Sequence, residues 1–242
     1  MTLAKRLVRA MSWTPWLPVA GIAALLAWSI TNLRPDFQAR NLHLRAGLLL
    51  AALGLSFAFD DTAAATTDPA PSQLRKRRLL RMLIALAPWS VVVLMLMWSG
   101  TIGGLAPTIV LTSPQERPEL PVGRLVLEGA TLAAWGLALA ALISSRWDNE
   151  PGKFASASLL ALYAVTWMLP ETRRPWAVPS DSQWLTAHFW WWVALGVGVF
   201  FVVAFSWDSR RRSTLSRLRR LHSRPSVRSG DTHATRATSL RP

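Results

Sequence analysis

The 242-residue sequence has no cysteine and few charged residues. The missing cysteine excludes a disulfide scaffold, a thiolate nucleophile and cysteine metal sites. Charged residues make up 17% of the chain, whereas a soluble globular protein has about a quarter. Hydrophobic residues make up 51%, which excludes a mostly disordered chain, because disorder requires low hydrophobicity. The net charge of +14 does not by itself favour nucleic-acid binding, which needs a basic face on a polar folded domain.

Long segments without charge predict membrane-spanning helices. Runs of 24, 34 and 26 uncharged residues follow Arg9, Arg81 and Asp181, and a helix crosses a bilayer with about 20 apolar residues. Only helices and closed barrels satisfy their backbone inside lipid, and runs without strand alternation favour helices. We therefore predict an all-α integral membrane protein with six transmembrane helices, near 16–33, 42–59, 80–101, 124–145, 154–170 and 185–206.

Basic residues in the connections predict the orientation of these helices. The connections on the N-terminal side, together with the two ends of the chain, hold 20 Lys and Arg, and the opposite side holds 7. By the positive-inside rule, both termini face the cytoplasm, and a multi-pass protein of the plasma membrane is expected. Residues 1–207 form the predicted transmembrane domain. Residues 208–242 hold 10 Arg and little to bury, which predicts a largely disordered cytoplasmic tail that is attracted to anionic membrane lipid.

The loop between the second and third predicted helices has paired acids before an alanine-rich stretch. Asp60 or Asp61 can cap a short helix through Ala63–Ala65 that ends at Pro69. So short a helix is marginal in water unless it docks against something. The alternative is that the acids are ordinary caps with no docking role.

With six spans, both ends inside and this loop, the chain resembles the permease subunit of an ABC-type exporter. Phe59-Asp60-Asp61, the following Ala63-Ala64-Ala65-Thr66 and the basic start of the third helix look more narrowly like small actinobacterial ABC permeases. The resemblance implies a coupling helix that docks on a separate ATP-binding cassette ATPase, with the contact formed by Asp60, Asp61 and Asp68. It also implies a second permease chain, identical or not.

The sequence contains no motif that is typical of a catalytic site. The sequence has no G-x-x-x-x-G-K-[ST] phosphate loop, so ATP and Mg are expected on the partner ATPase, and this chain is expected to bind no cofactor. It has no H-E-x-x-H, no G-x-S-x-G and no carboxylate-rich metal motif, so we expect no catalytic or metal-ligating residues. Two alternatives to a permease remain open. One is a membrane scaffold or sensor that recruits partners through the tail, and the other is an enzyme acting on lipid.

Glu128 is the acid predicted to lie within a span, and buried membrane acids are functional candidates. Arg124 lies four residues earlier on the same helix face, which predicts an ion pair between Arg124 and Glu128. His188 is predicted to be an interfacial histidine at the outer end of the sixth helix. The four-residue repeat of Ala130, Ala134 and Ala138 predicts a close helix contact, either within the bundle or with another copy.

Overall fold

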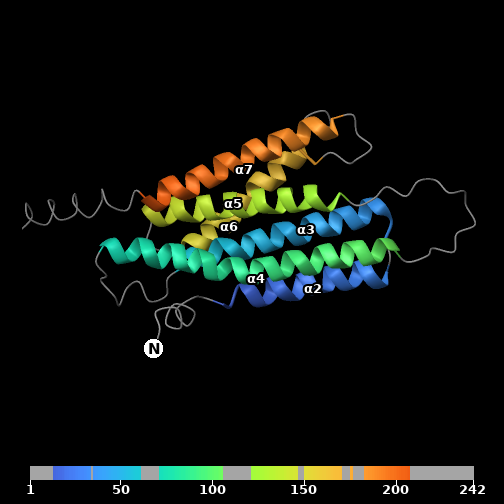
Figure 1. Ribbon diagram of the computed structural model, residues 1–242, viewed down its shortest axis with the longest axis horizontal. Coiled ribbons are helices and arrows are strands. Elements are labelled where there is room, and N and C mark those ends of the chain that lie inside the picture. Colours follow the sequence, from blue (N-terminus) through green and yellow to red (C-terminus); the bar gives the residue numbers. More distant parts are fainter. Residues whose placement is uncertain are drawn as a thin grey trace, which may run out of the picture. The chain divides into compact units, whose positions relative to one another are not determined.

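The computed structural model describes residues 13–33, 35–60, 71–105, 121–146, 150–170, 175–176 and 183–207. Every regular element in these residues is a helix, which confirms the all-α prediction for them (Figure 1). The elements are α2 (Trp16–Asn32), α3 (Phe37–Ser56), the 3-10 turn η1 (Phe57–Phe59), α4 (Pro71–Leu105), α5 (Val122–Arg146), α6 (Pro151–Met168) and α7 (Trp184–Trp207). Each predicted segment falls on one of these α-helices. The predicted tail, 208–242, lies outside the described residues.

Among the described residues, four segments are long and apolar enough to cross a membrane by length and composition: Phe37–Phe59, Leu79–Ile102, Val122–Arg146 and Trp184–Phe205. Helix α2 is also apolar but has 17 residues, at the lower limit of roughly 17 to 25 for a spanning helix. Helix α6 has 18 residues, and its first turn contains Gly152 and Lys153. The lengths therefore indicate a multi-pass membrane protein.

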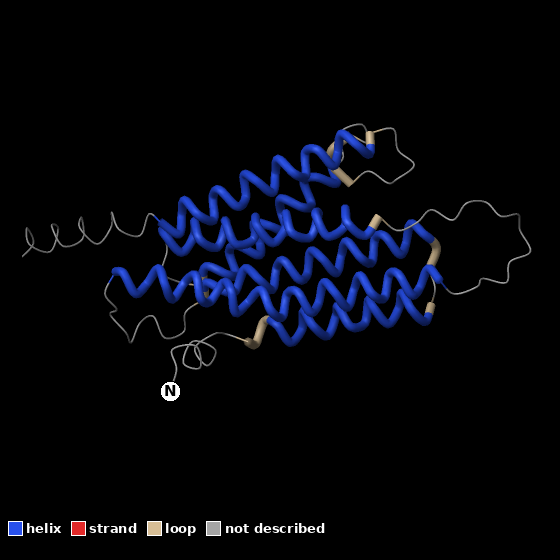
Figure 2. Tube along the Cα trace, viewed as in Figure 1, coloured by secondary structure: helices blue, strands red, loops and turns tan. Residues whose placement is uncertain are grey.

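Consecutive helices run in opposite directions. One hydrophobic cluster combines the starts of α2, α4 and α6 with the ends of α3 and α5, through Trp16, Met82, Ala155, Phe59 and Ala141, and Phe205 near the end of α7 packs against it. Figure 2 shows the same alternation along the trace. We call this the Asp60 end of the bundle, after the residue that follows η1, and the opposite one the Trp176 end.

Helices α3 and α5 form the centre of the bundle. Helix α3 packs against α2, α4, α5 and α6, and α5 packs against α3, α6 and α7. In Figure 1, α2 and α4 lie on one side of this pair and α7 on the other. In the apolar stretches of α3 and α5, 67% and 72% of the residues are buried, whereas in those of α4 and α7 the shares are 33% and 17%. The outer helices therefore present large apolar side chains to their surroundings, among them Leu94, Trp98 and Phe200, which is the pattern expected in lipid.

The small residues of α5 let neighbouring helices of the same chain approach closely. A Cβ placed on Gly198 of α7 would lie 3.1 Å from the Cβ of Ala134. On α5 itself, a Cβ at Gly136 would lie 3.1 Å from the carbonyl oxygen of Ala52 in α3. Of the two partners that the alanine repeat allows, the structure thus shows a contact within the bundle at Ala134.

Candidate functional site

A buried ion pair joins the two central helices at the Trp176 end. Arg45, in the third turn of α3, donates from Nε to Oε2 of Glu128 at 2.9 Å and from Nη2 to Oε1 at 3.0 Å. Glu128 lies in the second turn of α5, and the two side chains are 5% and 1% exposed. A two-point contact of this kind is the strongest pairing between a guanidinium and a carboxylate. It neutralises two charges at a depth where neither could stay unpaired.

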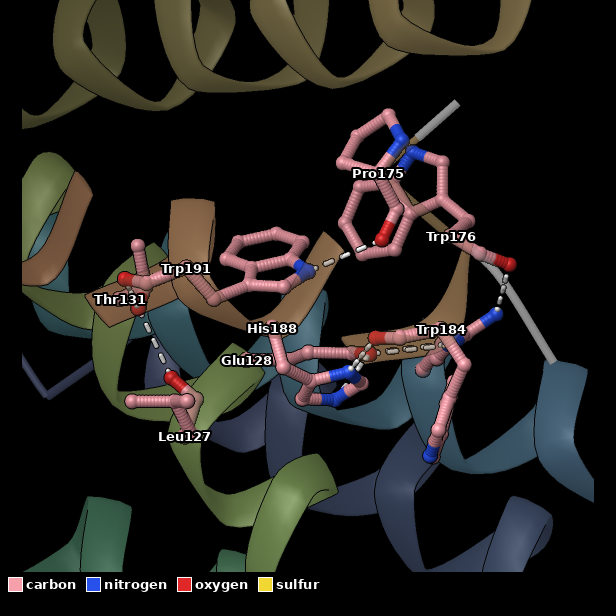
Figure 3. Close-up of polar contacts among 9 residues, drawn as sticks. Leu127, Glu128, Thr131, Pro175, Trp176, Trp184, His188 and Trp191 are labelled. Carbon is pink, nitrogen blue, oxygen red and sulfur yellow. Dashed lines mark hydrogen bonds and ion pairs between the residues drawn. The ribbon is translucent and has the colours of Figure 1, made fainter. Parts of the chain in front are cut away.

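The turn at Pro175–Trp176 is bound to three helices beside this pair. Arg45 donates from Nη1 to the carbonyl of Trp176 at 2.9 Å, and its guanidinium lies 5.6 Å from the centroid of that indole. The Trp176 indole donates to Oγ1 of Thr166 in α6 at 2.6 Å. From α7, the Trp191 indole donates to the Pro175 carbonyl at 2.9 Å (Figure 3). Helices α3, α6 and α7 are therefore connected through one two-residue turn.

His188 of α7 approaches the ion pair from a third helix. Its Nε2 lies 4.0 Å from Oε1 of Glu128 and makes no hydrogen bond, and the side chain is 8% exposed. Its Nδ1 is 2.7 Å from the carbonyl of Trp184 (Figure 3). A carbonyl can only accept, so this bond requires the proton on Nδ1, and Nε2 of the neutral ring is then unprotonated. With Glu128 neutralised by Arg45, a neutral His188 leaves this cluster of three side chains without net charge.

The structure corrects the predicted partner of Glu128. Helical spacing predicts Arg124, but both carboxylate oxygens accept from Arg45 on the facing helix. Arg124 instead places its guanidinium carbon 4.6 Å from the centroid of the Trp184 ring. Glu128 pairs with Arg45 because the guanidinium of α3 lies in the interior of the bundle, where the carboxylate would otherwise be buried without a partner.

Arg45 and Trp176 are site residues that motif and spacing rules do not find. The tally of Lys and Arg that predicts the orientation counts Arg45 with the outer connections, although Arg45 falls inside the predicted helix 42–59. A usable signal is that the second and fourth helices of an alternating bundle start at the same end. Arg45 and Glu128, of opposite charge, both lie near those starts. Trp176 carries no such signal, because its position depends on how the chain between α6 and α7 turns back.

An apolar pocket of about 380 Å³ lies between α6 and α7, with α5 behind it. Trp176 and Trp191 line it, as do Thr131 of α5 and Tyr163 of α6. Trp176 therefore contacts the ion pair through its carbonyl and ring and also bounds the pocket. The Trp176 end combines a buried charge cluster with an adjacent hydrophobic space.

At the opposite end, Asp60 caps the start of α6. Its Oδ1 accepts from the backbone N–H of Gly152 at 2.7 Å, one of the first groups of α6 that have no partner within the helix. Burial raises the pKa of the Asp60 carboxyl, against the opposing effect of the Gly152 hydrogen bond. Asp60 thus serves as a cap, as its residue type suggests. The helix that it caps is α6, which is distant in the sequence, and the predicted short helix directly after Asp60 lies outside the described residues. Asp61 and Asp68, predicted to contact an ATPase together with Asp60, lie outside the described residues.

Fold and site together define a helical membrane protein with a buried charge cluster at one end and a capped helix junction at the other. In the described ranges, no group of three or more His, Asp and Glu is placed to hold a metal ion. Comparisons with protein-family models, with curated proteins and with solved structures give no match.

Proposed function

We propose that the chain is the permease subunit of an ATP-driven ABC-type exporter in the plasma membrane. All six helices span the bilayer, and both termini face the cytoplasm. A separate ATPase binds ATP and Mg, and a second permease chain completes the pathway. The antiparallel order supports this arrangement, because the start of α2 and the end of α7 lie together at the Asp60 end. The basic run Arg75–Arg81 at the start of α4 favours the cytoplasm for that end.

The single observation that carries the proposal is the way η1 is connected. This turn touches α3, α4, α5 and α6, and Asp60, directly after it, binds the start of α6 through Gly152. A second bond joins α6 directly to α3, because Ser156 of α6 donates to the carbonyl of Leu53 in α3 at 3.2 Å. A partner that pushes on the segment after Asp60 would therefore act on four helices at once.

The Arg45–Glu128 pair supplies the fixed point for such a movement. It holds α3 to α5 at the Trp176 end, while the proposed ATPase contact lies at the Asp60 end. Closure of the ATPases would move η1 and the start of α4. Because α3 is held at its far end, this displacement becomes a tilt of α3 and α4 against α5 rather than a slide along it. The tilt would open a path between the permease chains towards the outer side.

Charge reversal in the loop tests the proposed contact. Asp61→Lys with Asp68→Lys should abolish co-purification of the ATPase from native membranes and leave membrane insertion unchanged. Asp60 is kept, because its substitution would also remove the cap of α6. The matched control is Asp208→Lys with Asp231→Lys, which makes the same charge change in the predicted tail and should retain the ATPase. Equal recovery of the ATPase with both double variants would refute the docking role of the loop.

Deletion of 208–242 separates the permease from the alternative of a tail-based scaffold. A permease that docks through its loop keeps its ATPase and most of its transport activity after the deletion. A scaffold that recruits partners through the tail loses them. Loss of the ATPase in the deleted chain, with the loop intact, would therefore favour the scaffold.

A further inference from the structure

The pocket between α6 and α7 has a buried floor and an exposed rim. Thr131 and Leu132 of α5 and Leu159 of α6, at 1% to 7% exposure, form the floor. The rim includes Leu162 of α6 and Val197 of α7, which are 47% and 39% exposed. The pocket therefore opens sideways, between two helices, onto the outer surface of the bundle. Its volume of about 380 Å³ falls within the roughly 300–1,000 Å³ of ligand pockets.

Five polar side chains of the pocket wall already donate hydrogen bonds within the protein. Thr131 donates to the carbonyl of Leu127, and Thr166 donates to that of Tyr163. Three indole N–H groups of the wall are also bonded, those of Trp135 to Ala194, Trp176 to Thr166 and Trp191 to Pro175. A ligand with donors or acceptors inside the pocket would lose its bonds to water and find no replacement among these groups. The wall therefore favours a hydrocarbon over a polar ligand.

The surroundings of the opening identify the source of that hydrocarbon. Beside the rim, α6 and α7 expose large apolar side chains, including Leu160, Val165 and Phe189. Such a surface faces lipid chains when the helices lie in a bilayer. We propose that the pocket binds one acyl chain of a membrane phospholipid, which enters laterally between α6 and α7 and reaches the floor on α5. Trp176 closes the pocket towards the Arg45–Glu128 pair.

This site goes beyond the proposed permease function and does not depend on it. A chain without any ATPase partner would still bind the lipid. Lipid binding can be measured on the purified full-length chain alone, and the result is then independent of whether an ATPase docks.

Photolabelling from within the bilayer tests the site. The full-length chain is reconstituted in phosphatidylglycerol vesicles that contain a minor fraction of a phosphatidylglycerol with a diazirine in one acyl chain. After illumination, peptide mass spectrometry locates the adducts. Lipid around the bundle can reach only exposed side chains, whereas a bound chain also reaches the floor. We expect adducts on residues 131–135 of α5, in addition to adducts on the exposed faces of α4 and α7. Adducts confined to exposed faces would overturn the proposal.

Matched substitutions control for general changes in lipid contact. Ala194→Phe, which enlarges a lining residue of α7, should lower labelling of 131–135 by about threefold or more, because one ring occupies much of a pocket of this size. Ala164→Phe, at an exposed position of α6 outside the lining, should leave it unchanged. A second pair repeats the test if Ala194→Phe does not fold, with Val197→Phe in the lining and Val199→Phe outside it. Equal labelling within the matched pairs would refute the site, as would floor labelling by diazirine palmitate and not by the phospholipid.

Discussion

Removing one member of the Arg45–Glu128 pair should destabilise the bundle far more than removing both. Glu128→Leu leaves a guanidinium that is 5% exposed without the acceptor of two of its hydrogen bonds. Breaking a buried pair from one side costs about 3–5 kcal/mol, and two charge-assisted bonds at about 1.5–3 kcal/mol each give a similar sum of about 3–6 kcal/mol. Arg45→Met should cost a similar amount, because it leaves the Glu128 carboxyl group buried without its two donors.

The double variant Arg45→Met/Glu128→Leu replaces both charges with apolar side chains. It should lie within about 1–2 kcal/mol of the wild type, the residual loss being the donor to the Trp176 carbonyl. The free energy of unfolding can be measured by denaturant titration in mixed micelles, with tryptophan fluorescence as the signal. The control is the pair Lys153–Glu150, whose 2.8 Å contact is more than half exposed on both sides and should contribute at most about 1 kcal/mol. Additive losses from the two single substitutions, or losses no larger than in the control, would refute the reasoning.

Three further predictions concern the helix junctions. Gly152→Ala should lower the unfolding temperature, because its Cβ would lie 2.8 Å from the backbone Cα of Phe57 and 2.8 Å from Oδ2 of Asp60. Gly196→Ala, with nothing within 4 Å, should be neutral or slightly stabilising. Burial raises the pKa of Asp60 above its ordinary 3.8, so the folded chain binds this proton more tightly than the unfolded chain. The stabilisation that this proton gives the folded chain is fully present below pH 3.8, the ordinary pKa. It is lost as the pH rises through the raised pKa of folded Asp60. The unfolding temperature of the wild type minus that of Asp60→Asn should therefore fall over this window and then level off, and a constant difference would contradict the assigned burial. Trp176→Phe removes the indole bond to Thr166 and should cost about 1 kcal/mol, whereas Trp98→Phe, on an indole that is 69% exposed, should cost less.

The helices themselves follow from composition, because a charge-free run of sufficient length has few alternatives in lipid. The segments predicted near 80–101 and 124–145 both lie within observed helices, α4 and α5. The ends are less predictable. Helix α3 begins at Phe37, because Asp36 accepts from the N–H of Ala39 and starts the helix before the apolar run does. Charge alone places the start of this helix too late, since a helix capped in this way continues through polar residues.

The site depends on contacts between helices, which a single sequence specifies weakly. Spacing within one helix relates Glu128 to Arg124, but the partner that wins, Arg45, comes from the facing helix. Asp60 is identified by sequence as a cap, and the N–H group that it caps belongs to Gly152, far along the chain. In both cases the residue type indicates that the carboxylate needs a hydrogen-bond donor. Which donor lies within reach depends on how the helices pack.

Docking of an ATPase on the loop after η1 is the central functional claim, and site-specific crosslinking measures it directly. The chain has no cysteine, so Ala64→Cys introduces a single reactive thiol in that loop. Gln38→Cys places the control thiol at an exposed position near the start of α3, at the Trp176 end. In native membranes treated with a thiol-to-amine crosslinker, Ala64→Cys should capture a protein with a phosphate-loop ATPase sequence, and Gln38→Cys should not. Capture of no ATPase by Ala64→Cys, or equal capture by both variants, would contradict the proposed function.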